Sequence, residues 1–255
     1  MLKKIKKIFK SNKGGMDAYL QLHIHREIDR IRQMPRYKDP LNLLPYGAKV
    51  YSQNDEDGMI QEIFRRIGTK NKAFVEFGIG NGLENNTLAL LFSGWRGLWI
   101  DASNKNIQRI RENFRPLLEG GQLRVEEAFI NKDNIDGLIA KHMNETEIDF
   151  LSVDIDGNDY YVFEAIQCLK ARVIAFEYNA KFIPPIEYCM DYNPEHVWSG
   201  DDCFGASLPF LERKLGEKGY ALVGCNVTGT NAFFVQKELA EGKFQAPFTA
   251  VYPAR

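Results

Sequence analysis

A glycine-rich segment, Glu76-Phe-Gly-Ile-Gly-Asn-Gly82, directly follows an apolar run and has the residue types of a ligand-binding turn. Glycine tolerates the backbone angles of a sharp turn, and its missing side chain lets the main chain approach a ligand closely. A second apolar run, 97–100, leads into Asp101, 19 residues after Gly82. A carboxylate at this point can accept hydrogen bonds from the ribose hydroxyls of an adenosine. The pattern therefore predicts a site for a cofactor that contains adenosine.

The glycine spacing and the acid before it separate two kinds of cofactor. A dinucleotide site has the pattern GxGxxG and presents a helix N-terminus to a pyrophosphate. Here the third glycine comes one position early, and Glu76 would repel that anion. The same acid can receive the ammonium group of a methionine moiety, which favours S-adenosylmethionine. A dinucleotide site and a turn that binds nothing are the alternatives. The residues expected to bind the cofactor are Glu76, Gly78, Gly80, Gly82, Asp101 and Ala128, the last as a wall of the adenine pocket.

Acidic side chains gather after two later apolar runs. Asp154 and Asp156 follow the run 148–153, and in an extended chain they point the same way. Two neighbouring carboxylates repel each other unless a positive charge lies between them, and such oxygen ligands suit Mg²⁺, Mn²⁺ or Ca²⁺. Glu177 and Asn179 follow the next run, so adjacent strands would bring the four side chains together. We expect Asp154, Glu177 and Asn179 as metal ligands, and Asp154 and Asp156 as catalytic residues. The alternative is that Asp154 or Asp156 lies by the cofactor's amine or caps the next helix.

A reaction without a metal would need a side-chain base, and His196 is the candidate among the four histidines. It lies in an irregular stretch, 182–205, after the fifth apolar run. Loops on a rigid sheet commonly carry specificity. The stretch holds side chains that suit a sugar or another polar ring, although each of them alone also fits packing or surface: Tyr188, Asp191, Tyr192, Trp198, Asp201, Asp202 and Phe204.

The elements that must position these residues follow from alternating patterns. Apolar runs at 73–77, 97–100, 123–130, 148–153 and 172–176 alternate with helical patterns around 85–93, 104–117, 133–143 and 158–169. This alternation predicts right-handed crossovers and a mostly parallel, doubly wound sheet. A helix near 207–218 and a hairpin of two strands, 220–225 and 231–235, complete the pattern. We expect a Rossmann-like α/β domain with seven strands, the last antiparallel.

An N-terminal helical extension is expected ahead of this domain. Residues 16–34 have helical periodicity, and Pro35, Pro40 and Pro45 interrupt any regular element after them. The predicted division is therefore an extension with its connector, residues 1–50, and a domain, residues 51–255. Residues 1–10 combine five lysines with a short apolar stripe, which predicts weak contact with an anionic membrane surface or a solvated tail.

The composition narrows the class of protein. A net charge of −1 gives no support to a nucleic-acid partner, which selects a basic face. The four cysteines form no CxxC pair and have no histidine at zinc spacing, which predicts reduced thiols in a cytoplasmic protein. No apolar run approaches the ~20 residues that a membrane-spanning helix needs. The oligomeric state is left open.

Four stretches resemble class I S-adenosylmethionine-dependent methyltransferases of the FkbM-like family: Tyr51–Gly58, Phe74–Gly82, Gly94–Asp101 and Leu151–Gly157. They span about residues 50–180. The resemblance implies S-adenosylmethionine as methyl donor and an O-methyl product, in a family often found near sugar and polysaccharide biosynthesis. The turn Gly-Ile-Gly-Asn-Gly departs from the family's more usual Gly-Ala-Asn-x-Gly.

The acids also resemble the metal site of catechol O-methyltransferase, in which an acid ends the fourth strand and an acid with an amide ends the fifth. Asp154, Glu177 and Asn179 match those roles by position, with the last two one residue further apart. Tylosin-type sugar O-methyltransferases use a comparable metal. Such a metal binds the acceptor hydroxyl, lowers its pKa and orients its oxygen.

The sequence therefore predicts a cytoplasmic O-methyltransferase for a hydroxyl of a small polar acceptor. The acceptor expected is a sugar, a nucleotide-sugar or a polysaccharide unit, with a divalent metal as an aid. A nicotinamide-dependent reductase and a non-catalytic S-adenosylmethionine-binding protein are the alternative functions.

Overall fold

The computed structural model describes residues 19–20, 22–246 and 249, and the chain divides into two compact units, Met1–Pro40 and Leu41–Arg255. In the first unit, residues 22–32 form a helix and η1 (Pro35–Tyr37) a short 3₁₀ turn. The membrane-surface contact expected of residues 1–10 lies outside the described residues. Among the described residues, none of the helices combines the length and the apolar character that crossing a membrane requires.

The division after Pro40 lies ten residues before the boundary that the sequence suggested. Residues 41–50 belong to the second unit because they pack into it. Leu43 is fully buried in its core, and the Asn42 side-chain amide donates to Gln245 Oε1 at 2.6 Å.

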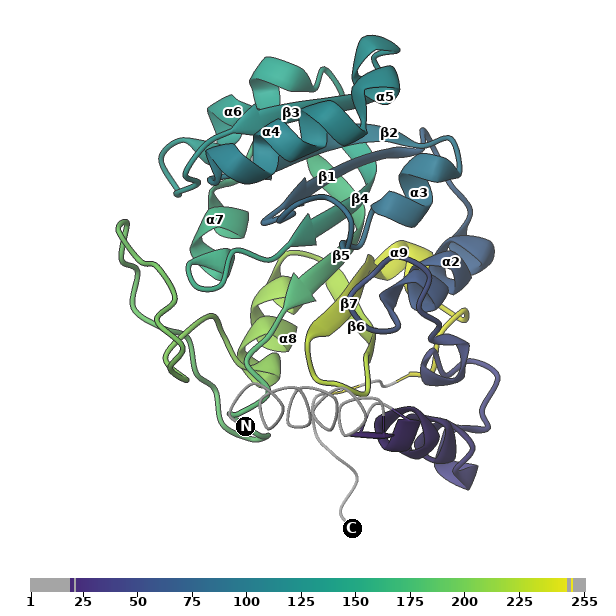
Figure 1. Ribbon diagram of the computed structural model, residues 1–255. Helices are drawn as coiled ribbons and strands as arrows, with labels where there is room; N and C mark the ends of the chain where they lie inside the picture. Colours follow the sequence, from purple (N-terminus) through teal and green to yellow (C-terminus); the bar gives the residue numbers. More distant parts are fainter. Residues whose placement is uncertain (1–18, 21, 247–248, 250–255) are drawn as a thin grey trace, which may run out of the picture. The chain divides into compact units, whose positions relative to one another are not determined.

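The second unit is built on a seven-stranded sheet with the order β3-β2-β1-β4-β5-β7-β6 (Figure 1). The strands are β1 (Ala73–Phe77), β2 (Arg96–Asp101), β3 (Leu123–Glu127), β4 (Glu147–Val153), β5 (Lys170–Glu177), β6 (Tyr220–Cys225) and β7 (Asn231–Gln236). Strands β1 to β5 pair in parallel, whereas β7 is antiparallel to both β5 and β6. The predicted Rossmann-like sheet with an antiparallel last strand is confirmed.

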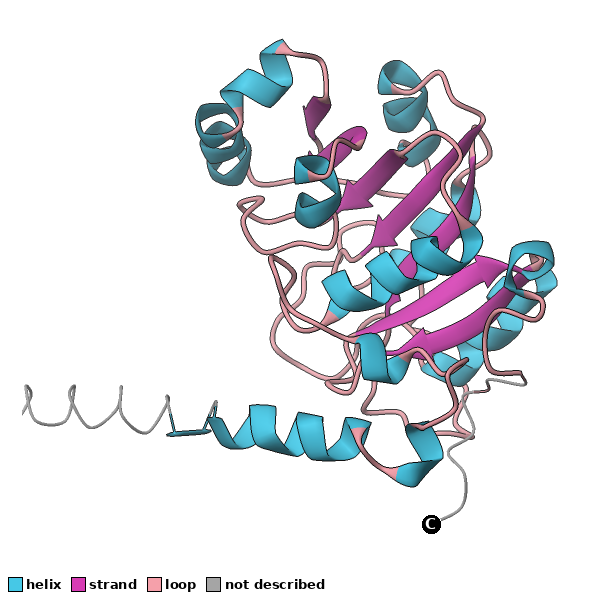
Figure 2. Cartoon of the chain, turned by 90° about the vertical axis from the view of Figure 1, so that its right-hand side faces the viewer, coloured by secondary structure: helices cyan, strands magenta, loops and turns pink. Residues whose placement is uncertain are grey.

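Helices cover both faces of this sheet (Figure 2). The helices are η2 (Leu44–Tyr46), α2 (Glu56–Ile67), α3 (Leu88–Phe92), α4 (Asn104–Asn113), α5 (Arg115–Glu119), α6 (Ile135–His142), α7 (Asp159–Ala165), α8 (Leu208–Glu217) and α9 (Lys237–Ala240). Side chains alternate along each strand, so Val75 and Phe77 enter the core under α6, α7 and α8, whereas Phe74 enters the core under α2, α3 and α4. The strand order reverses between β1 and β4, where ligands bind in sheets of this kind.

The helix predicted over 104–117 is two helices. Helix α4 ends at Asn113, and α5 begins at Arg115 with Pro116 in its first turn. Proline has no backbone N–H and is accommodated at a helix start, whereas it breaks a helix interior. The strand predicted over 123–130 likewise ends at Glu127.

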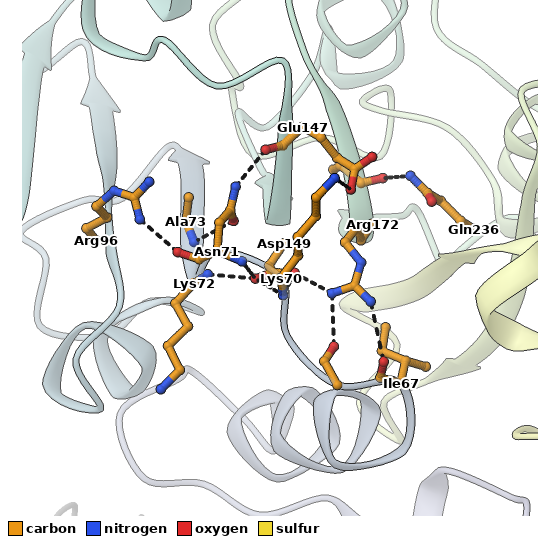
Figure 3. A network of polar contacts seen from close by, with 12 residues as sticks. Ile67, Lys70, Asn71, Lys72, Ala73, Arg96, Glu147, Asp149, Arg172 and Gln236 are labelled. Carbon is orange, nitrogen blue, oxygen red and sulfur yellow. Dashed lines mark hydrogen bonds and ion pairs between the residues drawn. The ribbon is translucent and has the colours of Figure 1, made fainter.

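A buried ion pair at the amino ends of β4 and β5 fixes the loop that leads into β1 (Figure 3). The Asp149 carboxylate is fully buried and accepts the backbone N–H groups of residues 70–72 at 2.7–2.9 Å. It also accepts from the Arg172 guanidinium, which donates in turn to Gly68 O at 2.9 Å. Because β1 carries the glycine turn at its far end, this network sets the start of the strand on which the candidate site depends.

Replacing Asp149 by alanine would leave the buried Arg172 charge without its counter-charge and the backbone N–H groups of residues 70–72 without their acceptor. Asp149→Ala should therefore lower the free energy of unfolding by about 3–5 kcal/mol in urea titrations. Glu147→Ala is the matched control, since Glu147 pairs with the exposed Lys70 Nζ at 3.0 Å and should cost less than about 1 kcal/mol. Equal losses in the two variants would contradict the account of this network.

Candidate functional site

The glycine turn follows β1 directly, and its three glycines differ in the space around them. All three have left-handed backbone angles, with φ of 70° at Gly78, 55° at Gly80 and 76° at Gly82. A Cβ at Gly78 would lie 1.6 Å from the backbone oxygen of Asp154, and one at Gly82 would lie 2.9 Å from the Trp99 ring. A Cβ at Gly80 would meet nothing within 4 Å. Gly78 thus permits the turn after β1 to touch the turn after β4, and Gly80 faces open space.

Asp101 ties the glycine turn to the end of β2. Its carboxylate accepts from Gly80 N at 2.9 Å and from Ser103 N at 2.8 Å, and the residue is 9% exposed. Its backbone oxygen accepts from Ala128 N at 3.1 Å, just after β3. The structure therefore brings the glycines, Asp101 and Ala128 to the carboxyl ends of three neighbouring strands, as their predicted role requires.

Glu76 lies under the segment that follows the glycine turn. Its buried carboxylate accepts from Asn86 N at 2.8 Å, from Thr87 N at 3.1 Å and from the Thr87 hydroxyl. Burial raises the pKa of Glu76 to about 7 against these hydrogen bonds. Glu76 is thus occupied in fixing the chain ahead of α3, a role that the sequence did not reveal. Its contact with a methionine ammonium stays a prediction.

Three carboxyl groups converge beyond β4 and β5: Asp154, Asp156 and Glu177, here named the acid cluster. One ligand atom from each lies within 4.8 Å of the others. Glu177 Oε2 is buried and has no hydrogen-bond partner. Burial and the neighbouring charge of Asp154 raise the pKa of Glu177 to about 11, and burial with the charge of Asp159 raises the pKa of Asp154 well above its usual range. Groups held in this way bind protons or a cation, so the cluster fits a divalent metal.

Asn179, the third metal ligand expected from the sequence, makes hydrogen bonds with the loop that follows β5. Its amide donates to Asp202 O at 2.9 Å and to Phe204 O at 3.0 Å, and its oxygen accepts from Lys181 N at 3.1 Å. The side chain thereby holds the following loop. Asp156 joins Asp154 and Glu177 in the acid cluster, and Asn179 as a metal ligand stays a prediction.

Asp159 shapes the turn that carries Asp154 and Asp156. It is 1% exposed, and its carboxylate accepts from Ile155 N at 2.7 Å and from Gly157 N at 2.8 Å. These bonds accommodate Asp156 at φ 55°, a left-handed angle that non-glycine residues rarely adopt. Asp159 is not among the residues expected at the site from the sequence, where its only signal is an acid two positions after a glycine at a helix start.

His196 lies against the same turn. Its Nε2 is 3.1 Å from the backbone oxygen of Asp156, and a Cβ on Gly157 would come within 2.2 Å of its ring. The structure thus places the predicted base next to the acid cluster, in contact with the backbone rather than with a carboxylate.

Comparisons with known proteins give the fold. No protein-family model and no curated protein matches the sequence. A protein from Staphylococcus aureus assigned as a caffeoyl-CoA O-methyltransferase is similar in structure, with a TM-score of 0.50 and 15% identity, over 86% of this chain and 98% of that one. The N-terminal domain of EvdMO1 with S-adenosylhomocysteine bound has a TM-score of 0.46 and 14% identity, over 83% and 94% of the two chains. An O-methyltransferase from Bacillus cereus in complex with S-adenosylhomocysteine has a TM-score of 0.44 and 17% identity, over 74% and 83%. The first likeness shows that the chain has the Rossmann-like methyltransferase fold.

The contact at Gly78 can be tested with a pair of glycine variants. Both Gly78→Ala and Gly80→Ala impose a left-handed angle on alanine, which costs about 1–2 kcal/mol. Only Gly78→Ala also forces the turn away from Asp154, so its total loss in urea unfolding should be about 3–5 kcal/mol. Similar losses of unfolding free energy in the two variants would show that the close approach of Gly78 to Asp154 does not contribute to stability.

Proposed function

We propose that this protein is an S-adenosylmethionine-dependent O-methyltransferase that acts on a hydroxyl of a small polar acceptor. The observation that carries the proposal is the contact of Gly78 with Asp154, which joins the glycine turn to the turn of the acid cluster. This contact lies where the strand order reverses, which is the usual position of ligands in sheets of this kind. A cofactor on the first turn would then present its reactive end beside the second.

The cofactor's adenosine would lie along the ends of β1 to β3. Asp101 would accept from the ribose hydroxyls with the lone pairs that Gly80, Ser103 and Asn106 leave free, and Ala128 would line the adenine. The open side of Gly80 leaves room for the close approach of a ligand to the main chain. Glu76 keeps the chain around Asn86 in place.

The acid cluster would supply the chemistry at the acceptor. Asp154, Asp156 and Glu177 fit a divalent metal because Glu177 Oε2 is buried without a partner and the carboxyl groups crowd one another. Such a metal lowers the pKa of a bound hydroxyl. The chain's own residues orient the acceptor and exclude water, and methyl transfer in line with the sulfur depends on that orientation. In a reaction without metal, an ionised member of the cluster or His196 takes the hydroxyl proton.

A sugar, a nucleotide-sugar or a polysaccharide unit is the acceptor that we infer. The support is the FkbM-like resemblance of residues 50–180 together with the loop after β5, in which Trp198 is 48% exposed among acidic residues. Aromatic faces beside hydrogen-bonding acids suit polar rings. The described cysteines are free thiols, in keeping with work in the cytoplasm.

Binding of S-adenosylhomocysteine is the first test. Calorimetry should show one saturable site, and thermal unfolding should shift upward with S-adenosylhomocysteine but not with NAD, since bound ligand stabilises the folded state. No saturation at high micromolar ligand would remove the methyltransferase proposal. Stabilisation by NAD alone would favour a nicotinamide-dependent reductase instead.

The role of the cluster is tested with Asp154→Ala. Production of S-adenosylhomocysteine, measured with a panel of free sugars, nucleotide-sugars and oligosaccharides, should fall at least about 100-fold, because the acceptor loses its base or its metal. Cofactor affinity should stay nearly unchanged. Glu119→Ala, which removes an exposed acid of α5 outside the proposed site, is the control. Equal activity with a chelator and with Mg²⁺ would remove the metal claim. A non-catalytic S-adenosylmethionine-binding protein would bind S-adenosylhomocysteine but would show no turnover.

A further inference from the structure

A long irregular segment, residues 190–204 and here named the flap, lies in the connection between β5 and α8. Its base is closed by the bridge of Cys189 with Ala206 and by the bond from Met190 N to Gly205 O at 3.0 Å. Figure 1 shows it as part of the green loop beside α7. The flap contains no helix or strand, so its position depends on contacts with the rest of the domain.

A reciprocal pair of hydrogen bonds anchors the middle of the flap. The Asn158 amide donates to Asn193 O at 2.6 Å, and its oxygen accepts from Asn193 N at 3.2 Å. Asn158 is 4% exposed, and although it precedes α7 it makes no side-chain capping bond there. Its side chain is therefore available to the flap rather than to the helix.

The same anchor reaches His196. The carbonyl of Asn193 that accepts from Asn158 also accepts from His196 N at 3.0 Å. The His196 ring then packs on Gly157, the neighbour of Asn158, and meets the backbone oxygen of Asp156. These contacts connect the flap to the turn that carries Asp154 and Asp156, two members of the acid cluster.

Burial of apolar side chains contributes little to holding the outer part of the flap against the domain. Val197 is 72% exposed and Trp198 48% exposed. A segment with few buried side chains opens readily unless polar contacts hold it. The bonds of Asn158 are therefore well placed to decide how far the flap stays closed.

We propose that Asn158 is a positioning residue that holds the flap, and with it His196, against the turn of Asp154 and Asp156. Resting on the proposed methyl transfer, this role sets the affinity for the acceptor rather than the affinity for the cofactor. Asn158 itself touches neither molecule in this account.

Chymotrypsin cleavage measures the anchor without any ligand. The flap holds aromatic cleavage sites, including Tyr192 and Trp198, whose products are assigned by mass spectrometry. Asn158→Ala should speed cleavage within the flap about tenfold, because two hydrogen bonds that favour the closed state are lost and cleavage follows the open population. Tyr161→Phe is the matched control: it removes the bond from Tyr161 OH to Met190 O, 2.9 Å, at the base of the flap, and should change cleavage less than about twofold.

The positioning role is read from the acceptor kinetics. Asn158→Ala should raise KM for the acceptor about tenfold with a smaller change in kcat, while the melting temperature and the affinity for S-adenosylhomocysteine stay as in the wild type. Unchanged cleavage of the flap would overturn the anchor. Faster cleavage with unchanged KM would overturn the positioning role. If the wild type fails to bind S-adenosylhomocysteine, the proposed function fails, and the cleavage rates still decide whether Asn158 holds the flap.

Discussion

The close approach of Gly78 to the backbone oxygen of Asp154 is the constraint on which the candidate site depends. A side chain at residue 78 has no room there, so only glycine lets the turns after β1 and β4 meet. Those two strands are neighbours at the point where the strand order reverses. The contact brings together the glycine turn and the acid cluster, which are more than 70 residues apart in the sequence.

Buried acids have different surroundings in this structure. Several accept backbone N–H groups and hold loops in place, among them Asp149 at the amino ends of the strands, and Glu76, Asp101 and Asp159 at the carboxyl ends. Glu177 differs, because one of its buried oxygens has no donor while two further carboxyl groups crowd it. Hydrogen bonds to backbone N–H groups compensate a carboxylate for lost water, whereas crowded acids without them keep an affinity for protons or metal ions. That difference separates the framework from the acid cluster.

Much of this could be predicted from the sequence, since apolar alternation and glycine spacing are local signals. The strands, the antiparallel β7 and the convergence of Asp154 with Glu177 follow from them. The partners of individual acids could not be predicted, because Glu76 meets Asn86 and Asn179 meets Asp202 only through tertiary folding. The break between α4 and α5 had a visible signal in Pro116, which the helical periodicity outweighed.

A crystal structure with S-adenosylhomocysteine and Mn²⁺ would locate both halves of the proposed site, because the sulfur marks one and the metal marks the other. We expect the ribose hydroxyls on Asp101, the sulfur beside the turn of Asp154, and the metal on Asp154, Asp156 and Glu177. Ligand bound away from the glycine turn, or a sulfur remote from the acid cluster, would contradict the claim that these two features form one methyl-transfer site.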